Sequence, residues 1–154
     1  MEIERKFLID SQQIKKSNRV KFIEQTYLSF EPEVRIRKVT NKSFILFRNN
    51  FYYLTVKSEG NMIRNEFEIK ISKRIYKELL NKAENKTIIK RRYEVQLENG
   101  LIAEIDEYKD FDFNTVEVEF KNEEQARNFI VPEWFGIDIT RNNQYKNKNL
   151  ARNL

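Results

Sequence analysis

Much of the chain consists of short segments in which polar and apolar residues alternate. Alternation with a period of two, in segments rich in β-branched and aromatic residues, predicts strands. Nine segments follow this pattern, at Glu2 to Ile9, Phe22 to Phe30, Val34 to Val39, Ser43 to Phe47, Tyr52 to Ser58, Arg64 to Ile71, Thr87 to Leu97, Leu101 to Tyr108 and Thr115 to Phe120. The pattern therefore predicts a mainly β protein of the α+β class.

Helical patterns separate the strands at two places and follow them at a third. Asn122 is a suitable N-cap for the second of these helices. We expect the three helices at Ser72 to Ala83, Glu123 to Ile130 and Asn143 to Ala151. Glu98-Asn99-Gly100 predicts a tight hairpin turn. Because the chain has no Pro- or Ser-rich linker and no internal repeat, we expect a single domain over residues 1–154.

The alternation divides each predicted strand into a charged face and an apolar face. Residues two apart in a strand share a face, so Glu2, Glu4 and Lys6 lie opposite Ile3, Arg5 and Phe7. Same-sign pairs recur in the later strands, and Lys57 joins them as a single charge. These pairs are Arg35 and Arg37, Glu66 and Glu68, Lys90 and Arg92, Glu104 and Asp106, and Glu117 and Glu119.

Two interpretations of the charged faces are possible. The usual one is that they form the solvated side of a one-sided antiparallel sheet. However, like charges at positions i and i+2 repel, and here they repeat in strand after strand, so they need compensation. In a closed barrel with these faces inward, eight carboxylates would face six cations. Such an interior must be satisfied internally or by ligands, and a metal-bound polyphosphate supplies both charges. The apolar faces would then point outward, where helices can cover them.

The composition narrows the chemistry further. The 154-residue chain has 29 Lys and Arg against 24 Asp and Glu, a net charge of +5 that favours anionic partners. It contains no Cys and no His, which excludes disulfides, thiolate catalysis, Ser-His nucleophiles and the commonest metal ligand. Catalysis must therefore use carboxylates, Lys, Arg, Tyr or metal-bound water.

The sequence also bears on location and partners. It shows neither a signal-peptide pattern nor a membrane-spanning apolar run, so we expect a cytoplasmic protein without a membrane partner. The basic residues interleave with acidic ones instead of forming a stripe, and no zinc spacing or RNP-type motif is present. We therefore expect no nucleic-acid partner.

The charged residues also resemble a known family, the CYTH superfamily of triphosphate tunnel metalloenzymes. Glu2-Ile3-Glu4-Arg5-Lys6 has the form of its ExExK signature and lies at the N-terminus, as it does in the family. The resemblance covers nearly the whole chain and is to small bacterial inorganic triphosphatases. The further similar blocks are Gln25-Thr26-Tyr27-Leu28, Val34-Arg35-Ile36-Arg37, Leu54-Thr55-Val56-Lys57, Arg64-Asn65-Glu66-Phe67-Glu68, Lys90-Arg91-Arg92-Tyr93, Glu104-Ile105-Asp106, Val116-Glu117-Val118-Glu119, Ile139-Thr140-Arg141 and Tyr145-Lys146-Asn147-Lys148-Asn149-Leu150-Ala151.

The resemblance implies a closed, eight-stranded antiparallel tunnel barrel with a charged interior and helices packed outside. Phosphate oxygens would be bound by Lys6, Arg35, Arg37, Lys57, Lys90 and Arg92. The cofactor, Mg²⁺ or Mn²⁺, would be held by Glu2, Glu4, Asp106, Glu117 and Glu119. The catalytic residues would be Glu4, Glu66 and Lys6. Supporting roles would fall to Glu68, Glu104, Tyr27, Tyr145 and Lys148.

The expected reaction is metal-dependent hydrolysis of a triphosphate-containing small molecule, inorganic tripolyphosphate to pyrophosphate and phosphate. A class IV type adenylate cyclase, or a thiamine or nucleoside triphosphatase, would use the same phosphate-binding residues, so these alternatives stay open. A non-catalytic polyphosphate-binding module is the alternative of another class. The eight carboxylates count against it, because a pure anion binder gains nothing from negative charge beside its ligand.

One segment departs from the family pattern. Residues 38–51 exceed the tight hairpin usual between these two strands, and they contain Phe44, Ile45, Leu46 and Phe47. The segment is either an extended hairpin or an apolar arm that serves as a lid or a contact in a homodimer.

Overall fold

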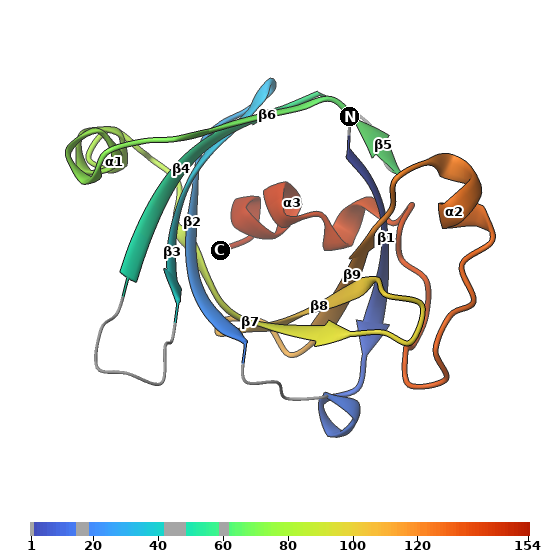
Figure 1. The fold of residues 1–154 in the computed structure, drawn as a ribbon. Coiled ribbons are helices and arrows are strands. Elements are labelled where there is room, and N and C mark those ends of the chain that lie inside the picture. The colour runs from blue at the N-terminus through green and yellow to red at the C-terminus, as the bar shows by residue number, and fades with distance from the viewer. Residues whose placement is uncertain (1, 15–18, 42–48, 59–61) are drawn as a thin grey trace.

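A computed structural model describes residues 2–14, 19–41, 49–58 and 62–154. Within them, one antiparallel sheet of nine strands has the order β5-β1-β9-β8-β7-β2-β3-β4-β6. The sheet curls around a central space (Figure 1). Its strands are β1 (Glu2–Ile9), β2 (Val20–Phe30), β3 (Glu33–Asn41), β4 (Asn49–Lys57), β5 (Ile63–Arg64), β6 (Glu66–Lys70), β7 (Thr87–Gln96), β8 (Ile102–Tyr108) and β9 (Asn114–Glu119).

The two ends of the strand order are adjacent in the chain. β5 pairs with β1 and β6 pairs with β4, yet only Asn65 separates β5 from β6. One stretch of chain therefore reaches both ends of the curled sheet. The sequence predicts one strand here, and counting β5 and β6 as one gives the eight strands expected. Complete hydrogen-bonded closure into a tunnel stays a prediction.

The apolar core lies on the outer face of the sheet. Ile3, Phe7, Val116 and Val118, which alternate with the charged residues of β1 and β9, are all buried. They pack under Ala126 of helix α2 (Glu123–Arg127), together with aromatic residues of the segment that follows it. Phe7 contacts Phe129 and Phe135 in this cluster, with ring centroids 6.5 and 5.1 Å away. The prediction that apolar faces point outward beneath a helix is confirmed on this side.

A second helix covers a different part of the outer face. Helix α1 (Lys73–Leu80) begins at Ser72, whose side chain accepts a hydrogen bond from the backbone N of Ile75. Its buried Tyr76 packs on Ile36 of β3 and Tyr52 of β4, both outward-facing residues. The helix does not cover all of the outer face, and Phe67 of β6 is 62% exposed there.

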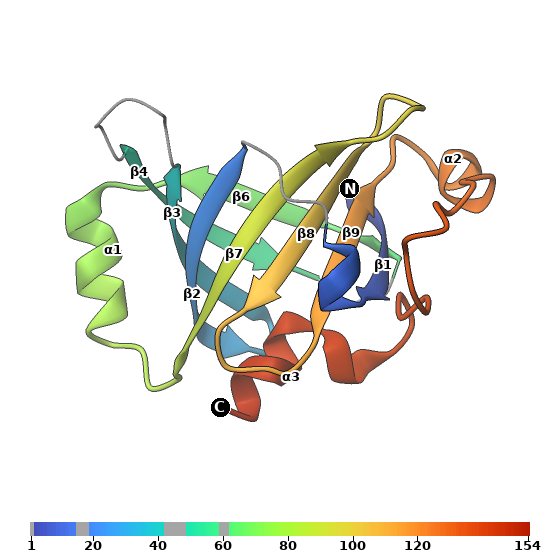
Figure 2. The same cartoon turned by 90° about the horizontal axis from the view of Figure 1, so that it is seen from below.

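The third helix corrects the expectation that all helices pack outside. Helix α3 (Asn147–Arg152) lies across one end of the curled sheet (Figures 1 and 2). Its Leu150 and Ala151 are buried against the inward-facing Tyr27, Ile88 and Tyr108. The C-terminal helix therefore closes one end of the central space.

Element boundaries differ from the predicted ones at several points. α2 ends at Arg127 instead of Ile130, because the backbone leaves the helical conformation at its C-cap Asn128 (φ −86°, ψ 3°). The predicted helix from Asn143 to Ala151 is a 3₁₀ turn (Asn143–Tyr145) and then α3, divided by the extended backbone of Lys146. The predicted strand Ser43 to Phe47 lies outside the described residues. No described helix is long and apolar enough to cross a membrane.

The outer core makes a direct prediction for stability. Phe7 is 1% exposed, so Phe7→Ala should lower the free energy of unfolding by about 3–5 kcal/mol. Phe67→Ala, on the outer face of β6, should change it by no more than about 0.5 kcal/mol. Urea denaturation of both variants measures the difference. Similar losses at the two positions would contradict a core that lies outside the sheet.

Candidate functional site

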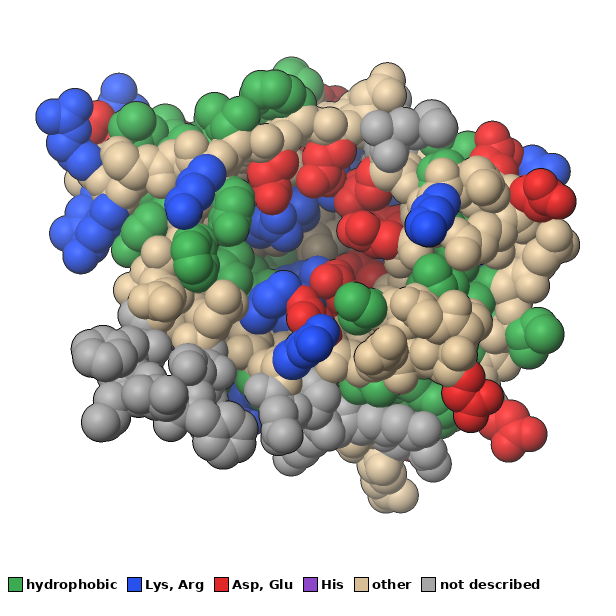
Figure 3. All heavy atoms as spheres, in the orientation of Figure 1, with side chains coloured by type: hydrophobic (Ala, Val, Ile, Leu, Met, Phe, Trp, Pro, Cys, Tyr) green, Lys and Arg blue, Asp and Glu red, His purple; other side chains and the backbone are tan. Residues whose placement is uncertain are grey.

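The inner face of the sheet forms a cavity whose wall is almost entirely polar. All six cations predicted to bind phosphate line it. Six predicted carboxylates line it with them, at Glu2, Glu4, Glu66, Glu104, Glu117 and Glu119. Figure 3 shows acidic and basic side chains gathered around the opening of this hollow. The predicted convergence of the charged faces on one cavity is therefore confirmed.

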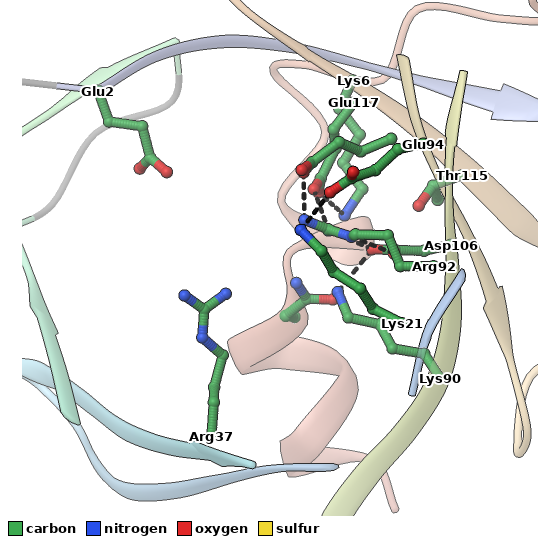
Figure 4. Close-up of polar contacts among 12 residues, drawn as sticks. Glu2, Lys6, Lys21, Arg37, Lys90, Arg92, Glu94, Asp106, Thr115 and Glu117 are labelled. Atoms are coloured by element: carbon green, nitrogen blue, oxygen red, sulfur yellow. Dashed lines mark hydrogen bonds and ion pairs between the residues drawn. The ribbon is translucent and has the colours of Figure 1, made fainter. Parts of the chain in front are cut away.

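Arg92 of β7 is the centre of an ion-pair network on one wall (Figure 4). Its Nε and Nη2 donate to the two carboxylate oxygens of Asp106, at 2.6 and 2.7 Å. Nη2 also donates to Glu117 at 2.8 Å, and Nη1 donates to Glu104. A planar guanidinium suits this forked geometry, whereas Lys could not reproduce it. The network fixes Arg92 against the wall.

Two lysines of the cavity wall pair with carboxylates of other strands, Lys6 on the neighbouring strand β9 and Lys57 on the distant strand β1. Lys6 Nζ lies 2.9 Å from Glu117 Oε1. Burial has the largest single effect and would lower the pKa of Lys6, but the charge and hydrogen bond of Glu117, together with Tyr108 and Asp106, outweigh burial and raise the pKa. Lys57 Nζ donates to both carboxylate oxygens of Glu2 at 2.8 Å, and it also pairs with Glu66. Each lysine is therefore paired with a carboxylate of another strand.

Arg37 lies near a second arginine, Arg35. Burial and the neighbouring charge of Arg35 lower the pKa of Arg37, although its ion pair with Glu68 opposes them. Within the described residues, the Nε atoms of Arg35 and Arg37 are buried without a hydrogen-bond partner. Figure 4 shows Arg37 pointing into the space across from Arg92. A buried donor without a partner is costly, so this region suits an anion.

Lys90 lies beside Asp106 and Arg92 on the other wall. Its Nζ donates to Asp106 Oδ2 at 2.5 Å. Burial lowers the pKa of Lys90 to about 8, with the charge of Arg92 adding to the effect and Asp106 opposing it. The fold therefore places a cation where its charge is disfavoured, which an anionic ligand would relieve.

A surplus of negative charge lies on the β1, β8 and β9 side. Glu4 faces Glu119 across neighbouring strands, and Glu104 faces Glu117. Like charges in such positions destabilise a sheet. Desolvation and the negative charges of Glu104 and Glu2 raise the pKa of Glu119. For Glu117, burial would also raise the pKa, but Lys6 and Arg92 outweigh burial and hold it well below its usual value.

The acidic side has the donor chemistry of a site for a hard divalent cation. Carboxylate oxygens are the ligands that Mg²⁺ and Mn²⁺ prefer, and a cation would relieve both like-charge pairs. In this arrangement of the described residues, no three acidic side chains converge closely enough to hold a metal ion. The residues therefore fit such an ion by chemistry and charge, while several of them are engaged with Lys or Arg.

Three predicted residues lie outside the lining of the cavity. Asp106 is completely buried beneath Lys90 and Arg92, which occupy its oxygens. Glu68 accepts from Arg37 and, at 2.7 Å, from Thr55 Oγ1. Tyr27 is buried, and its OH accepts a 2.9 Å hydrogen bond from Gln25 Nε2. The predicted supporting residues Tyr145 and Lys148 do line the cavity.

Sequence reasoning missed part of the cavity wall. Gln25 and Glu33 line it, and each lies two residues before an inward residue that was recognised, Tyr27 or Arg35. Extending the alternation by one step would have found both. The C-terminal segment contributes five more residues, which no strand pattern indicates: Ile139, Thr140, Asn142, Lys146 and Asn147.

Comparisons with known proteins agree with this geometry. Residues 1–150 match the CYTH domain family. The chain belongs to the CYTH domain family. It is 34% identical over 158 residues to an inorganic triphosphatase of Nitrosomonas europaea, covering 99% of this chain and 98% of that protein. It is 30% identical to an inorganic triphosphatase of Acetivibrio thermocellus, covering 99% and 94%.

Two solved structures share the fold. The crystal structure of an inorganic triphosphatase matches with a TM-score of 0.66 and 32% identity, covering 98% of this chain and 94% of that chain. The structure of a protein from Pyrococcus horikoshii has a TM-score of 0.62 at 20% identity, which shows the likeness of the fold alone.

The buried pairs in this CYTH domain predict a large effect at Asp106. Asp106→Asn leaves Lys90 without the buried carboxylate that it binds and removes one of the three carboxylates paired with Arg92, so the free energy of unfolding should fall by about 3–5 kcal/mol. The control is Glu107→Gln, because Glu107 pairs with the exposed Arg91 at 3.3 Å and should contribute less than about 1 kcal/mol. Denaturant titration compares them, and a mild effect at Asp106 would show that the buried network is not structural.

Proposed function

We propose that this CYTH domain protein binds a triphosphate in the cavity and hydrolyses it, with inorganic tripolyphosphate cleaved to pyrophosphate and phosphate as the preferred reaction. The observation that carries the proposal is the convergence of six Lys and Arg side chains and a group of carboxylates on one cavity. The two relatives named inorganic triphosphatase support it. The proposal treats residues 1–154 as one functional domain.

The cations would position the substrate. Phosphoryl transfer needs little covalent chemistry from the protein, so most of the rate enhancement comes from alignment and from neutralising charge. Arg35 and Arg37 have buried Nε donors available, and both line the cavity. Lys6 would neutralise charge at the reacting phosphate. Its partner Glu117 also accepts a hydrogen bond from Arg92, so Glu117 would keep a cationic partner when Lys6 binds the phosphate.

The carboxylates would hold the divalent ion and the attacking water. Mg²⁺ or Mn²⁺ would be held by Glu2, Glu4, Glu117 and Glu119. When bound, the ion would neutralise the negative charge on the phosphate oxygens. We assign to Glu4 or Glu66 the task of accepting a proton from the attacking water. Asp106, predicted as a metal ligand, is better placed to hold Lys90 and Arg92 in position.

The cavity wall supports a small inorganic substrate over a nucleotide. Among its described lining residues, Ile139 and Tyr145 are the ones with apolar or aromatic side chains, and the others are charged or carry amides or hydroxyls. A nucleobase would need an apolar or stacking surface. Tyr145 instead packs edge-on against Phe113, with ring centroids 5.1 Å apart.

The decisive test is phosphate release from tripolyphosphate, ATP, thiamine triphosphate and pyrophosphate, each with Mg²⁺, Mn²⁺ or Ca²⁺. We expect tripolyphosphate to be turned over fastest with Mg²⁺ or Mn²⁺, and chelation with EDTA to abolish turnover, because both the phosphate charge and the acidic side need the ion. Cyclic AMP from ATP would favour the cyclase alternative. Tight binding of tripolyphosphate without metal-dependent turnover would favour a binding module.

Glu119 provides a test with two opposite effects. Glu119→Gln removes one member of the like-charge pair with Glu4, so without metal the variant should be more stable by about 0.2–1 kcal/mol. The same change should raise the metal concentration for half-maximal activity at least about tenfold, since a metal-binding oxygen loses its charge. Glu123→Gln, on the exposed surface of α2, should do neither. Loss of stability in metal-free Glu119→Gln would contradict the assignment.

A further inference from the structure

Arg5 lies on the outer face of β1, and its guanidinium joins three segments of the chain. Nη2 and Nε donate to Asp138 Oδ2 at 2.6 and 3.2 Å. Nη1 donates to the backbone carbonyl of Ala126 in α2 at 3.2 Å. The guanidinium also lies over the ring of Phe7, 5.0 Å from its centroid. The alternation assigns Arg5 only to the side away from the cavity, with no role in the site.

Asp138 transmits this contact to Thr140. One carboxylate oxygen, Oδ2, accepts from Arg5, while the other, Oδ1, accepts from the Thr140 hydroxyl at 2.6 Å and from the Thr140 backbone N at 2.9 Å. Desolvation would raise the pKa of Asp138, but the hydrogen bonds from Thr140 and Arg5 outweigh it and lower the pKa. The carboxylate therefore stays charged and links the two residues.

Thr140 in turn binds the peptide of Lys6, whose side chain enters the cavity. The Lys6 backbone N donates to Thr140 Oγ1 at 3.0 Å, and the Lys6 carbonyl accepts from the backbone N of Ile139 at 2.8 Å. The segment before it follows β1 closely, because Gly136 donates to the Leu8 carbonyl at 2.8 Å. A Cβ at Gly136 would lie 2.7 Å from that oxygen, so only glycine permits this approach.

The same segment leads directly into the cavity wall. Ile139, Thr140 and Asn142 line the cavity, and the chain then continues through Tyr145 into α3, which covers one end of the central space. We infer that Arg5 is a positioning residue: through Asp138 and Thr140 it fixes the peptide of Lys6 and the start of the C-terminal wall. This inference rests on the proposed function and adds to it a residue outside the cavity.

The consequence is a specific kinetic effect. When the Arg5 contact is lost, Lys6 keeps its own ion pair with Glu117, but the wall formed by residues 139–148 is held less firmly against β1. Substrate binding should suffer more than the chemical step. We therefore expect Arg5→Gln to raise KM for tripolyphosphate about tenfold and to change kcat less than about threefold.

The matched control is Arg91→Gln. Arg91 is also an outward arginine that pairs with a carboxylate, Glu107 at 3.3 Å, and lies over an aromatic ring, that of Phe22 at 5.5 Å. It does not line the cavity. The KM of Arg91→Gln for tripolyphosphate should equal that of the unsubstituted protein. Equal changes in KM for Arg5→Gln and Arg91→Gln would overturn the inference, as would a loss of thermal stability in Arg5→Gln with KM unchanged.

A double-substitution cycle tests the relay itself. Asp138→Asn should raise KM about as much as Arg5→Gln, and the double variant should be no worse than either single one, because both remove the same connection. A double variant whose KM rises about a hundredfold, as expected for two independent effects, would overturn the relay from Arg5 through Asp138. Thr140→Val removes only the hydroxyl and should give the same direction of change. It provides the test if Arg5→Gln fails to fold.

Hydrogen exchange separates this inference from the proposed function. In Arg5→Gln, but not in Arg91→Gln, the backbone amides of Lys6 and Ile139 should exchange faster, whether or not a substrate is turned over. If the unsubstituted protein fails to hydrolyse tripolyphosphate while this difference is seen, the proposed function fails and the positioning by Arg5 stands. Unchanged exchange in Arg5→Gln would overturn the positioning by Arg5.

Discussion

Like charges that face each other across neighbouring strands are the constraint on which this structure depends. Glu4 faces Glu119 and Glu104 faces Glu117, so the inner faces of β1, β8 and β9 carry an excess of negative charge that Lys6 of β1 offsets only in part. Arg92 of the next strand, β7, counters part of this charge. Lys57 of β4 reaches Glu2 of β1, although these strands lie near opposite ends of the strand order. Curling the sheet is what brings the compensating charges together.

The inward charges decide where the hydrophobic core must form. Each inward Glu, Lys or Arg leaves its apolar neighbours in the strand on the outer face, as with Phe7 beside Lys6 and Val118 between Glu117 and Glu119. Burial of these residues requires cover from outside, which α2 and the segment after it provide on one side and α1 on the other. Helices α1 and α2 therefore contribute residues to the hydrophobic core that the sheet needs in order to fold. α3 differs because it packs on Tyr27 and Ile88 from within.

The face of each strand could be predicted from the sequence because a period of two is a local property. The degree of burial of each inward side chain could not be predicted from the sequence. Alternation places Asp106 and Glu104 on the same face, although Asp106 is buried beneath Arg92 and Glu104 lines the cavity. The C-terminal wall was seen only in part: Tyr145 and Lys148 were predicted through the family resemblance, while the break at Lys146 and the return of Asp138 to Arg5 were not. The return of Asp138 depends on a contact between residues 133 positions apart in the chain, which no local pattern indicates.

The two signs of charge in the cavity argue for the kind of ligand it takes. The buried Nε atoms of Arg35 and Arg37 have no hydrogen-bond partner among the described residues, although Arg37 pairs with Glu68. Around Glu119, burial and the neighbouring carboxylates disfavour its negative charge. The first region can therefore accept a further anion, and the second a cation. A polyphosphate alone would relieve the first region and add to the repulsion in the second, while a metal ion alone would do the reverse. A metal-bound triphosphate, the ligand that we propose, carries both signs together and would relieve both regions. This is why the carboxylates support an enzyme for metal-bound triphosphate over a simple anion binder.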